Sequence, residues 1–379
     1  MIRLKRSLIL VFFVIFIVIF NEYFIYYITI KFGCSWPILV NETNRPSSSK
    51  IALISDTHIL GYVHGHWFDK LRREWQMYQA FQTFISLMPP DAVFFLGDQF
   101  DEGHISRENA FTEYSDRFNS LFYVPKNIKR IVVAGNHDIG FHYEISPVRL
   151  NWYFQNFNHD IVEHITIGLN HFVIINSMAM ERDGCRLCKD AERKLEDLRY
   201  KFNCATNRTK HCVSNFSVPY SRPILMQHFP LYRKSDATCE NGPDSASEPR
   251  KSKLYLENWD CLSVESTNFV LNSLNPRAVF DGHAHFACRT WWPSPYSFWE
   301  WTVPSFSWRN TPQPSILFLT VSPNELKVNK CLLPNENTVI GIYLTSAILF
   351  FIYVFYQFCK KIVKPKRHAS YQLFQNKVD

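Results

Sequence analysis

The sequence has no internal repeat, no low-complexity segment and, away from its two ends, no excess of charge of either sign. Nine of its 41 Lys and Arg residues and one of its 34 acidic residues lie within residues 1–7 and 359–379. The rest of the chain therefore holds 32 basic and 33 acidic residues. A balance so close to zero provides no basic surface for nucleic acid, and we predict no nucleic-acid partner.

The charge at the two ends flanks two long apolar runs, residues 8–30 and 338–358. Each run is long enough to cross a bilayer, and basic residues lie on its outer side. We therefore predict two transmembrane helices with both termini in the cytoplasm. Glu22 lies within the first run, where a carboxylate is costly. A cleaved signal peptide remains the alternative for this first run.

This topology divides the chain into predicted parts. They are a cytoplasmic tail (1–7), a transmembrane helix (8–30), a lumenal linker (31–50), a lumenal domain (51–337), a second transmembrane helix (338–358) and a second cytoplasmic tail (359–379). Three acceptor sequons, at Asn41, Asn207 and Asn215, are in the part predicted to be lumenal and are predicted glycosylation sites.

Nine of the ten cysteines also lie between the two apolar runs, where disulfides persist if that part is lumenal. The motif CRLC at residues 185–188 has the spacing of half a zinc site, but no second pair of matching spacing follows. We therefore favour disulfides among Cys185 to Cys261 over zinc. An odd number of cysteines leaves at least one without a partner in this region.

Short apolar runs alternate with helical patterns through most of the domain, which predicts an α/β fold. The predicted buried strands are IALIS (51–55), DAVFFLG (91–97), IKRIVVAG (128–135), HFVIINS (171–177), RPILMQH (222–228) and PRAVFDG (276–282). Apolar residues from Leu71 to Met88 recur at helical spacing before a Pro pair. ILFLTV and LKVNKC predict a closing antiparallel hairpin, and residues 235–253 predict a long surface loop.

Polar side chains follow five of these strands at the point where each strand ends. They are Asp56 and His58, Asp98 and Asp101, Asn136 to Asp138, His228, and His283 with His285. Ligands of open α/β sheets bind at the carboxyl ends of strands, so we expect these side chains to converge. Carboxylate, amide and imidazole are ligands that Mn, Fe and Zn accept, and the set contains no cysteine.

The ordered set D-x-H, G-D-x-x-D, G-N-H-D, H and G-H-x-H resembles the calcineurin-like metallophosphoesterase superfamily over residues 50–310. This resemblance implies a four-layer αββα sandwich and two divalent metal ions bridged by one carboxylate. By the same resemblance, one ion would be held by Asp56, His58, Asp98 and His285. The other would be held by Asp98, Asn136, His228 and His283.

Phosphodiester hydrolysis also needs a proton for the leaving alkoxide. We predict that His137 is the general acid and that Asp101 sets its tautomer and raises its pKa. Substrate contacts are predicted for His66, Trp67 and Arg309, by aromatic stacking and by pairing of Arg309 with a second phosphate. Packing in the core is the favoured alternative for Trp67 and for Phe306.

Further motifs, GNHDIGFHY, QHFPLYR and VPSFSWR among them, resemble a membrane-anchored branch of the superfamily. That resemblance implies a Mn-dependent phosphodiesterase, with Zn or Fe as alternative ions, that removes an ethanolamine-phosphate side branch from a mannose of GPI anchors. It implies GPI-anchored proteins as substrates, the lipid bilayer and cargo receptors of ER exit as partners, and a place in the ER, the ER exit sites, the ER–Golgi intermediate compartment and the Golgi. Two alternatives remain: a lumenal phosphatase or phosphodiesterase for another substrate, and a catalytically silent cargo receptor for GPI-anchored proteins.

Overall fold

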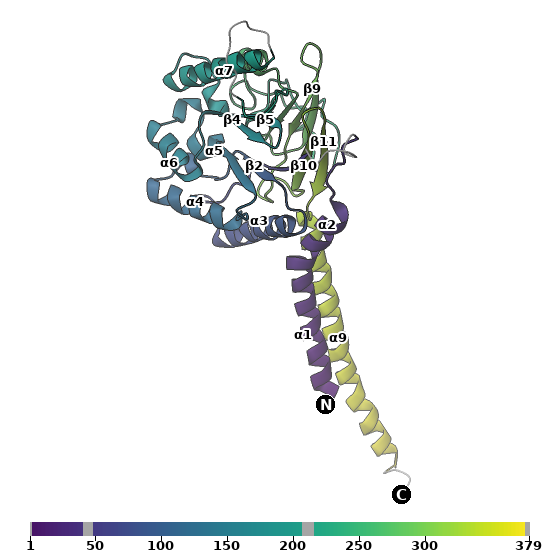
Figure 1. Cartoon of the computed structure of the whole chain (residues 1–379). Helices are drawn as coiled ribbons and strands as arrows, with labels where there is room; N and C mark the ends of the chain where they lie inside the picture. The colour runs from purple at the N-terminus through teal and green to yellow at the C-terminus, as the bar shows by residue number, and fades with distance from the viewer. Residues whose placement is uncertain (1, 41–47, 207–215, 376–379) are drawn as a thin grey trace. The chain divides into compact units, whose positions relative to one another are not determined.

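The computed structural model describes residues 2–40, 48–206 and 216–375, so the predicted glycosylation sites Asn41, Asn207 and Asn215 lie outside the described residues. Figure 1 shows the helices and strands along the chain. The α-helices are α1 (Ile2–Ile19), α2 (Ile25–Gly33), α3 (Trp67–Leu87), α4 (Glu108–Leu121), α5 (Asn136–Ile139), α6 (Pro147–Phe157), α7 (Arg186–Ala205), α8 (Val264–Leu274) and α9 (Glu336–Gln375). The strands are β1 (Ser49–Ile54), β2 (Ala92–Leu96), β3 (Lys129–Val133), β4 (Val162–Ile167), β5 (Asn170–Ile175), β6 (Ile224–Met226), β7 (Ala278–Asp281), β8 (Cys288–Trp292), β9 (Phe298–Thr302), β10 (Ser315–Val321) and β11 (Leu326–Leu332). Short helical turns are η1 (Phe20–Phe24), η3 (Gly103–Ile105), η4 (His142–Glu144) and η5 (Ser177–Ala179).

The strands form two sheets. The first has the order β11-β10-β1-β2-β3, and the second has the order β4-β5-β6-β7-β9-β8. Strands β1, β2 and β3 are parallel, as are β5, β6, β7 and β9, while β10–β11, β4–β5 and β8–β9 pair antiparallel. All six predicted strands and the predicted closing hairpin are present, so the α/β prediction is confirmed.

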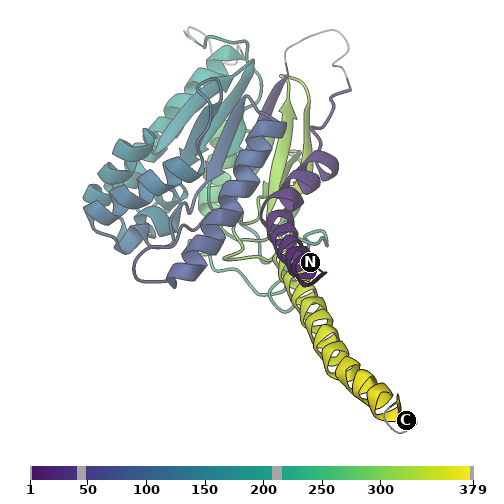
Figure 2. The ribbon, with the colours of Figure 1, turned by 90° about the horizontal axis from the view of Figure 1, so that it is seen from below.

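The core lies between the two sheets because successive residues of a strand point to opposite faces. Phe94 of β2 packs on Phe172 of β5, with ring centroids 5.4 Å apart, and both belong to one buried apolar cluster. The next residue, Phe95, points the other way and contacts Phe81 of α3 and Phe118 of α4. Helices α3 and α4 cover the outer face of the first sheet, and α7 and α8 pack together beside the second (Figures 1 and 2). These four layers are the predicted αββα sandwich.

Helix α3 shows how local signals set an element's ends. Its N-cap His66 accepts a hydrogen bond from the Phe68 N–H (3.3 Å), and the helix ends just before Pro89 and Pro90. The observed helix therefore begins one turn before the predicted one.

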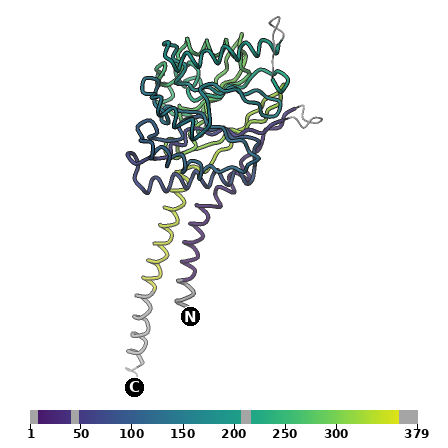
Figure 3. The backbone as a smooth tube through the Cα atoms, turned by 60° about the vertical axis from the view of Figure 1, so that its left-hand side comes forward, coloured from purple at the N-terminus to yellow at the C-terminus, as the bar shows by residue number. Residues whose placement is uncertain are grey.

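The two apolar runs form helices that contain candidate membrane spans at Leu8–Gly33 and Glu336–Lys360, of 26 and 25 residues. Helices α1 and α9 run side by side in opposite directions (Figures 1 and 3). The costly Glu22 carboxylate accepts a 2.5 Å hydrogen bond from the Tyr343 hydroxyl of α9. This bond replaces part of the hydration that Glu22 would lose within a membrane.

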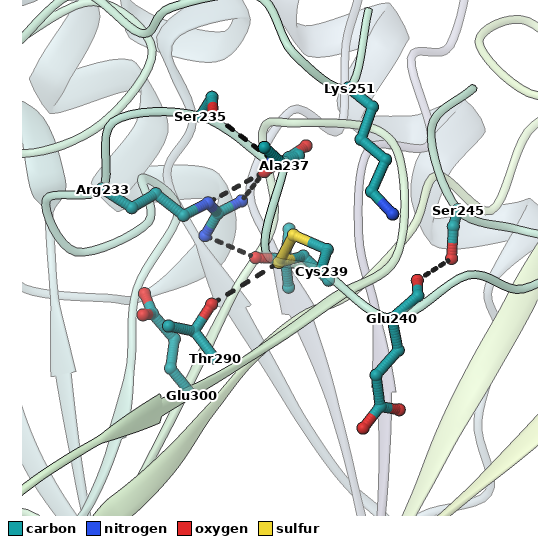
Figure 4. Close-up of a disulfide and its surroundings, with 12 residues drawn as sticks. Arg233, Ser235, Ala237, Cys239, Glu240, Ser245, Lys251, Thr290 and Glu300 are labelled. Atoms are coloured by element: carbon teal, nitrogen blue, oxygen red, sulfur yellow. Dashed lines mark hydrogen bonds and ion pairs between the residues drawn. A yellow bond between two sulfur atoms is a disulfide. The ribbon is translucent and has the colours of Figure 1, made fainter. Parts of the chain in front are cut away.

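Two disulfides attach irregular segments to the sheets. Cys34–Cys331 ties the end of α2 to β11, and Trp36 stacks on Phe318, so residues 34–40 of the predicted linker lie against the first sheet. Cys239–Cys288 ties the predicted loop to β8 (Figure 4). That loop is irregular as predicted, but it is not wholly at the surface, because Asp236, Cys239, Asp244 and Lys251 are buried in it.

The predicted pairing of cysteines among Cys185 to Cys261 is wrong in part. Cys204 is disulfide-bonded, but Cys185, Cys188 and Cys261 form no disulfide in this structure, and Cys239 pairs beyond this range. Sequence spacing could not reveal this pairing, because the partner of Cys239 comes from a strand that approaches it only in the folded sheet.

Candidate metal centre

The polar strand ends converge because β1, β2 and β3 are adjacent parallel strands in one sheet and β6 and β7 are adjacent parallel strands in the other. Beyond β1 and β2 the backbone pairing continues, with the Asp56 N–H donating to Gly97 O (3.1 Å) and the His58 N–H to Asp98 O (3.0 Å). Beyond β6 and β7, the Gly282 N–H donates to His228 O (2.9 Å). The pairing of the strands therefore also fixes the positions of the polar residues that follow them.

The backbone at this edge is strained. Asp56, His58, Asp98, His283 and His285 all have positive φ, between 44° and 66°. Residues with a Cβ rarely adopt this conformation, and it costs about 1–3 kcal/mol each. Such strain persists only where the surroundings impose it, which is typical of functional sites.

Seven predicted metal ligands form what we call the donor cluster: Asp56, His58, Asp98, Asn136, His228, His283 and His285. Ligand atoms of Asp56, His58, Asp98 and His285 lie within 4.8 Å of one another, as do those of Asp98, His228 and His283. Asn136 Oδ1 lies 3.1 Å from His228 Nε2. Asp98 belongs to both groups, since its Oδ2 is 3.5 Å from His58 Nε2 and 3.3 Å from His228 Nε2. A single carboxylate is thus placed where a bridge between two ions would be.

Outer partners set the tautomers of three of the histidines. His58 Nδ1 faces the Asp101 carboxylate (3.2 Å), His228 Nδ1 faces Leu96 O (2.7 Å), and His283 Nε2 faces Trp259 O (2.8 Å). Because these oxygens only accept, each facing nitrogen carries the proton. The other nitrogen of each ring therefore has a lone pair available for a metal ion.

The inner atoms lack suitable donors. Asp56 Oδ1, Asp98 Oδ2 and His283 Nδ1 are buried without a hydrogen-bond partner. His58 Nε2 lies 3.2 Å from His285 Nε2, and His228 Nε2 lies 3.1 Å from Asn136 Oδ1, so each pair is favourable only with a proton or a cation between its two atoms. Buried acceptors that no donor reaches are unfavourable unless a cation lies beside them. The residues therefore fit a pair of divalent ions.

Protonation in the metal-free protein supports the same arrangement. Burial lowers the pKa of His58, but hydrogen bonds with Asp101 and Asp56 outweigh it and raise the pKa to about 10. Burial likewise lowers the pKa of His228, but Asp98 raises it to about 9. Burial lowers the pKa of His283 to about 4, and that of His285 to about 3. In the metal-free protein, His58 and His228 therefore each carry a proton at the nitrogen that would bind a metal ion.

His137 lies at the edge of the donor cluster. Its backbone N–H donates to Asp98 Oδ1 (2.8 Å), and a Cβ at the preceding Gly135 would meet that same oxygen at 2.2 Å. The ring Nδ1 donates to the backbone carbonyl of Asp101 (2.9 Å), which leaves Nε2 for proton exchange.

The prediction that the Asp101 side chain contacts His137 is wrong. The Asp101 carboxylate contacts His58 and, at 3.3 Å, Arg309 Nη2, and only its backbone carbonyl contacts His137. These partners hold the pKa of Asp101 below its ordinary value against the effect of burial. Sequence spacing could not separate the two roles, because both belong to one residue.

The three predicted substrate contacts differ in position. Arg309 adjoins the donor cluster through Asp101, whereas His66 caps α3. Trp67 is 66% exposed, so the favoured packing role for it is wrong, while Phe306 is fully buried as predicted.

A hollow of about 600 Å³ opens beside His283 and was not predicted. Arg250, Lys253, Tyr255 and Asp260 line it together with His283. Trp259, whose carbonyl holds His283, stacks on Phe141 with centroids 4.2 Å apart. The basic residues of the irregular loop were the available sequence signal, but only the Cys239–Cys288 disulfide and the fold bring that loop here.

A two-ion centre of Asp, Asn and His at the strand ends of an αββα sandwich defines a class of metal-dependent phosphoesterases. The sequence profile of the calcineurin-like phosphoesterases matches residues 49–287. The chain therefore belongs to the calcineurin-like phosphoesterase family and is a metallophosphoesterase.

Within this family, the chain is similar to proteins named Metallophosphoesterase 1. The chain is 42% identical to the Metallophosphoesterase 1 homolog of Caenorhabditis elegans over 98% of its own length and 97% of the relative. It is 41% identical to Metallophosphoesterase 1 of Gallus gallus, over 92% of this chain and 89% of that one. A dimetal phosphatase from Danio rerio of known structure is 13% identical over 75% of this chain and 98% of its own, with a TM-score of 0.44, which adds nothing to the assignment.

Proposed function

We propose that the protein is a phosphodiesterase that removes an ethanolamine-phosphate side branch from a mannose of GPI anchors. The observation that carries this proposal is the juxtaposition of the donor cluster with the basic hollow at His283. The similarity to relatives named Metallophosphoesterase 1 supports it.

Asp56, His58, Asp98 and His285 would hold one ion, and Asp98, Asn136, His228 and His283 the other. We propose Mn²⁺ for both, with Zn or Fe as alternatives. When bound, such ions supply Lewis acidity toward water and toward the phosphoryl oxygens.

The remaining steps belong to the chain's own residues. His137 Nε2 donates a proton to the departing mannose oxygen, while Nδ1 stays bonded to Asp101 O. Arg250 and Lys253 attract the anionic diester into the hollow. Arg309 is held by Asp101 and is placed to contact a further phosphate.

A lipid-linked glycan also has apolar and sugar surfaces. Leu254, Leu256 and Trp259 are 70%, 63% and 45% exposed next to the lining residues of the hollow. Their exposure suits an amphiphilic substrate, because large apolar side chains gathered at the surface often mark binding sites.

The two apolar helices would anchor the protein in membranes of the early secretory pathway, from the ER and its exit sites to the Golgi. The basic tails support cytoplasmic termini, and the disulfides Cys34–Cys331 and Cys239–Cys288 support a lumenal catalytic domain. GPI-anchored proteins would be the substrates, and cargo receptors of ER exit would be further partners.

Mass spectrometry of GPI glycans from cells lacking the protein tests this function. We expect ethanolamine-phosphate to be retained on the mannose core, and wild-type protein but not His137→Ala to remove it. An unchanged glycan would reject the GPI substrate in favour of another phosphoester. Rescue by His137→Ala would point to a silent cargo receptor.

A further inference from the structure

A second group of potential metal ligands, here called the cysteine cluster, consists of His142, Asp183, Cys185 and Cys188. One ligand atom of each lies within 4.8 Å of the others. His142 is in η4, Asp183 precedes α7, Cys185 is the N-cap of α7, and Cys188 lies in its first turn. The cluster shares no residue with the donor cluster.

The two sulfur atoms are brought together by the start of α7. The Cys188 N–H donates to Cys185 Sγ (2.9 Å), and the two Sγ atoms lie 2.6 Å apart. Cys188 is fully buried, and its Sγ lies 3.3 Å from Asp183 Oδ1. Two sulfurs this close can join in a disulfide, or can move apart to about 3.7 Å as two ligands of one tetrahedral zinc ion, given Zn–S bonds of about 2.3 Å.

His142 and Asp183 add two further ligand groups beside the sulfurs. His142 Nδ1 donates to Met178 O (3.0 Å), and Nε2 lies 2.9 Å from Asp183 Oδ2, where the protonated ring forms an ion pair with the carboxylate. A disulfide would involve only the two sulfurs. A cation would use the nitrogen, the carboxylate and both sulfurs, whose ligand atoms lie within 4.8 Å of one another, and would take the place of the proton on Nε2.

The donor set matches one ion above others. Two thiolates, an imidazole and a carboxylate form the tetrahedral, soft-to-borderline environment that Zn²⁺ takes in closed structural sites. The outer contacts are of the kind that such sites require: Met178 O fixes the His142 ring, and the Cys185 N–H donates to Asp183 Oδ1 (2.9 Å).

We propose that His142, Asp183, Cys185 and Cys188 bind one structural Zn²⁺ ion, separate from the two ions of the donor cluster. The ion would join η4, which follows the GNHD segment, to the start of α7. Phe141, next to His142, stacks on Trp259, whose carbonyl contacts His283. The zinc ion would therefore hold this contact in place without taking part in hydrolysis.

The test measures metal content of the full-length protein, purified in detergent, by inductively coupled plasma mass spectrometry. We expect Cys185→Ser/Cys188→Ser to lose one zinc per chain and to keep the other metals. The matched control is Cys261→Ser, which removes a buried thiol whose contact is Arg233 O and should change no metal. Asp98→Ala should keep this zinc while it loses the ions of the donor cluster, so the two proposals fail separately.

Two further measurements guard against misfolding of the double variant. Replacement of zinc by Co²⁺ in the wild-type protein should give a thiolate-to-cobalt charge-transfer band that Cys185→Ser/Cys188→Ser lacks. Asp183→Asn, a change at an exposed residue, should weaken zinc retention more than about tenfold against a chelator.

Alkylation of wild-type protein then decides between zinc and a disulfide. Protection of Cys185 and Cys188 that a chelator removes supports the proposal. Protection that only a reductant removes, or free reactivity with no zinc bound, overturns it.

Discussion

The donor cluster and the cysteine cluster are built in different ways. The donor cluster gathers residues from the ends of five strands, and its closest sequence neighbours on different strands are 38 residues apart or more. The cysteine cluster draws on η4, one loop and one helix N-terminus, with no ligand on a strand. The two sheets fix the positions of the donor cluster. The cysteine cluster instead depends on how η4 packs against the start of α7. We expect the first to control catalysis and the second to control local stability.

The strongest test of this difference is Asp98→Ala. Loss of the shared carboxylate should empty both proposed ion sites and lower phosphodiester hydrolysis more than about a thousandfold, because several kcal/mol of charge stabilisation is removed. Metal analysis and assay of bis(p-nitrophenyl) phosphate measure both effects. Asp69→Ala, a half-exposed acid of α3 outside the donor cluster, is the control and should keep both metals and activity. Retention of two ions by Asp98→Ala would refute the bridging role.

Next in size is His137→Ala, which should keep the metals and lower turnover about 10²- to 10⁴-fold on an alkyl diester. The defect should shrink with a nitrophenolate leaving group, which departs without a proton. His104→Ala is the control, since that ring packs on His137 with centroids 5.5 Å apart and is outside the donor cluster. An equal defect on both leaving groups would argue against His137 as the acid.

Asp101→Asn sharpens the corrected role of this residue. The variant removes the carboxylate that orients His58 but keeps the backbone carbonyl that holds His137. Metal affinity should fall about 10- to 100-fold, as measured by chelator competition, while the hydrolysis rate of fully loaded enzyme changes less. The opposite pattern, full affinity with lost turnover, would restore the direct link to His137.

Metal binding at the donor cluster should depend on pH. His58 and His228 have pKa values raised to about 10 and about 9 in the metal-free fold, so each is protonated at pH 7 and must release its proton to a metal ion. Between pH 7 and 8, apparent affinity should rise about tenfold for each proton displaced, and calorimetry in buffers of different ionisation enthalpy should count the protons.

The same shifts set a stability trend without metal. The raised pKa values stabilise the metal-free fold below about pH 6.5, and that contribution is lost as pH rises through 9 to 10. Thermal unfolding of chelator-treated protein over this range checks the sign. Stability of the metal-free protein that does not fall as pH rises through 9 to 10 would contradict the assigned protonation.

The smallest effect is expected from Arg250→Ala. Arg250 is an exposed residue of the hollow, and its loss should raise KM a few-fold with little change in kcat, since solvent screens its charge. Arg193→Ala on α7, also exposed, is the control. A fall in kcat would instead place Arg250 among the groups that act in the transition state.

Much of the fold and the seven donor residues could be predicted, because apolar strands and the polar residues at their ends are local patterns. Contacts across the fold could not. Cys239 pairs with Cys288 of β8, Asp101 reaches His58 with its side chain and His137 with its carbonyl, and the hollow at Arg250 forms from an irregular loop. No second pair of matching spacing follows CRLC, because the polar groups that lie beside it, His142 and Asp183, come from segments with no fixed spacing to it.

The sequence by itself determined the order of strands and helices, the two apolar ends and the identity of the donors, since these follow from side-chain chemistry and short-range periodicity. The tertiary structure alone decided which nitrogen of each histidine is available, which carboxylate orients which ring, and which cysteines pair. These properties depend on distances of a few ångströms between segments far apart in the chain, and only the packing of the two sheets sets such distances.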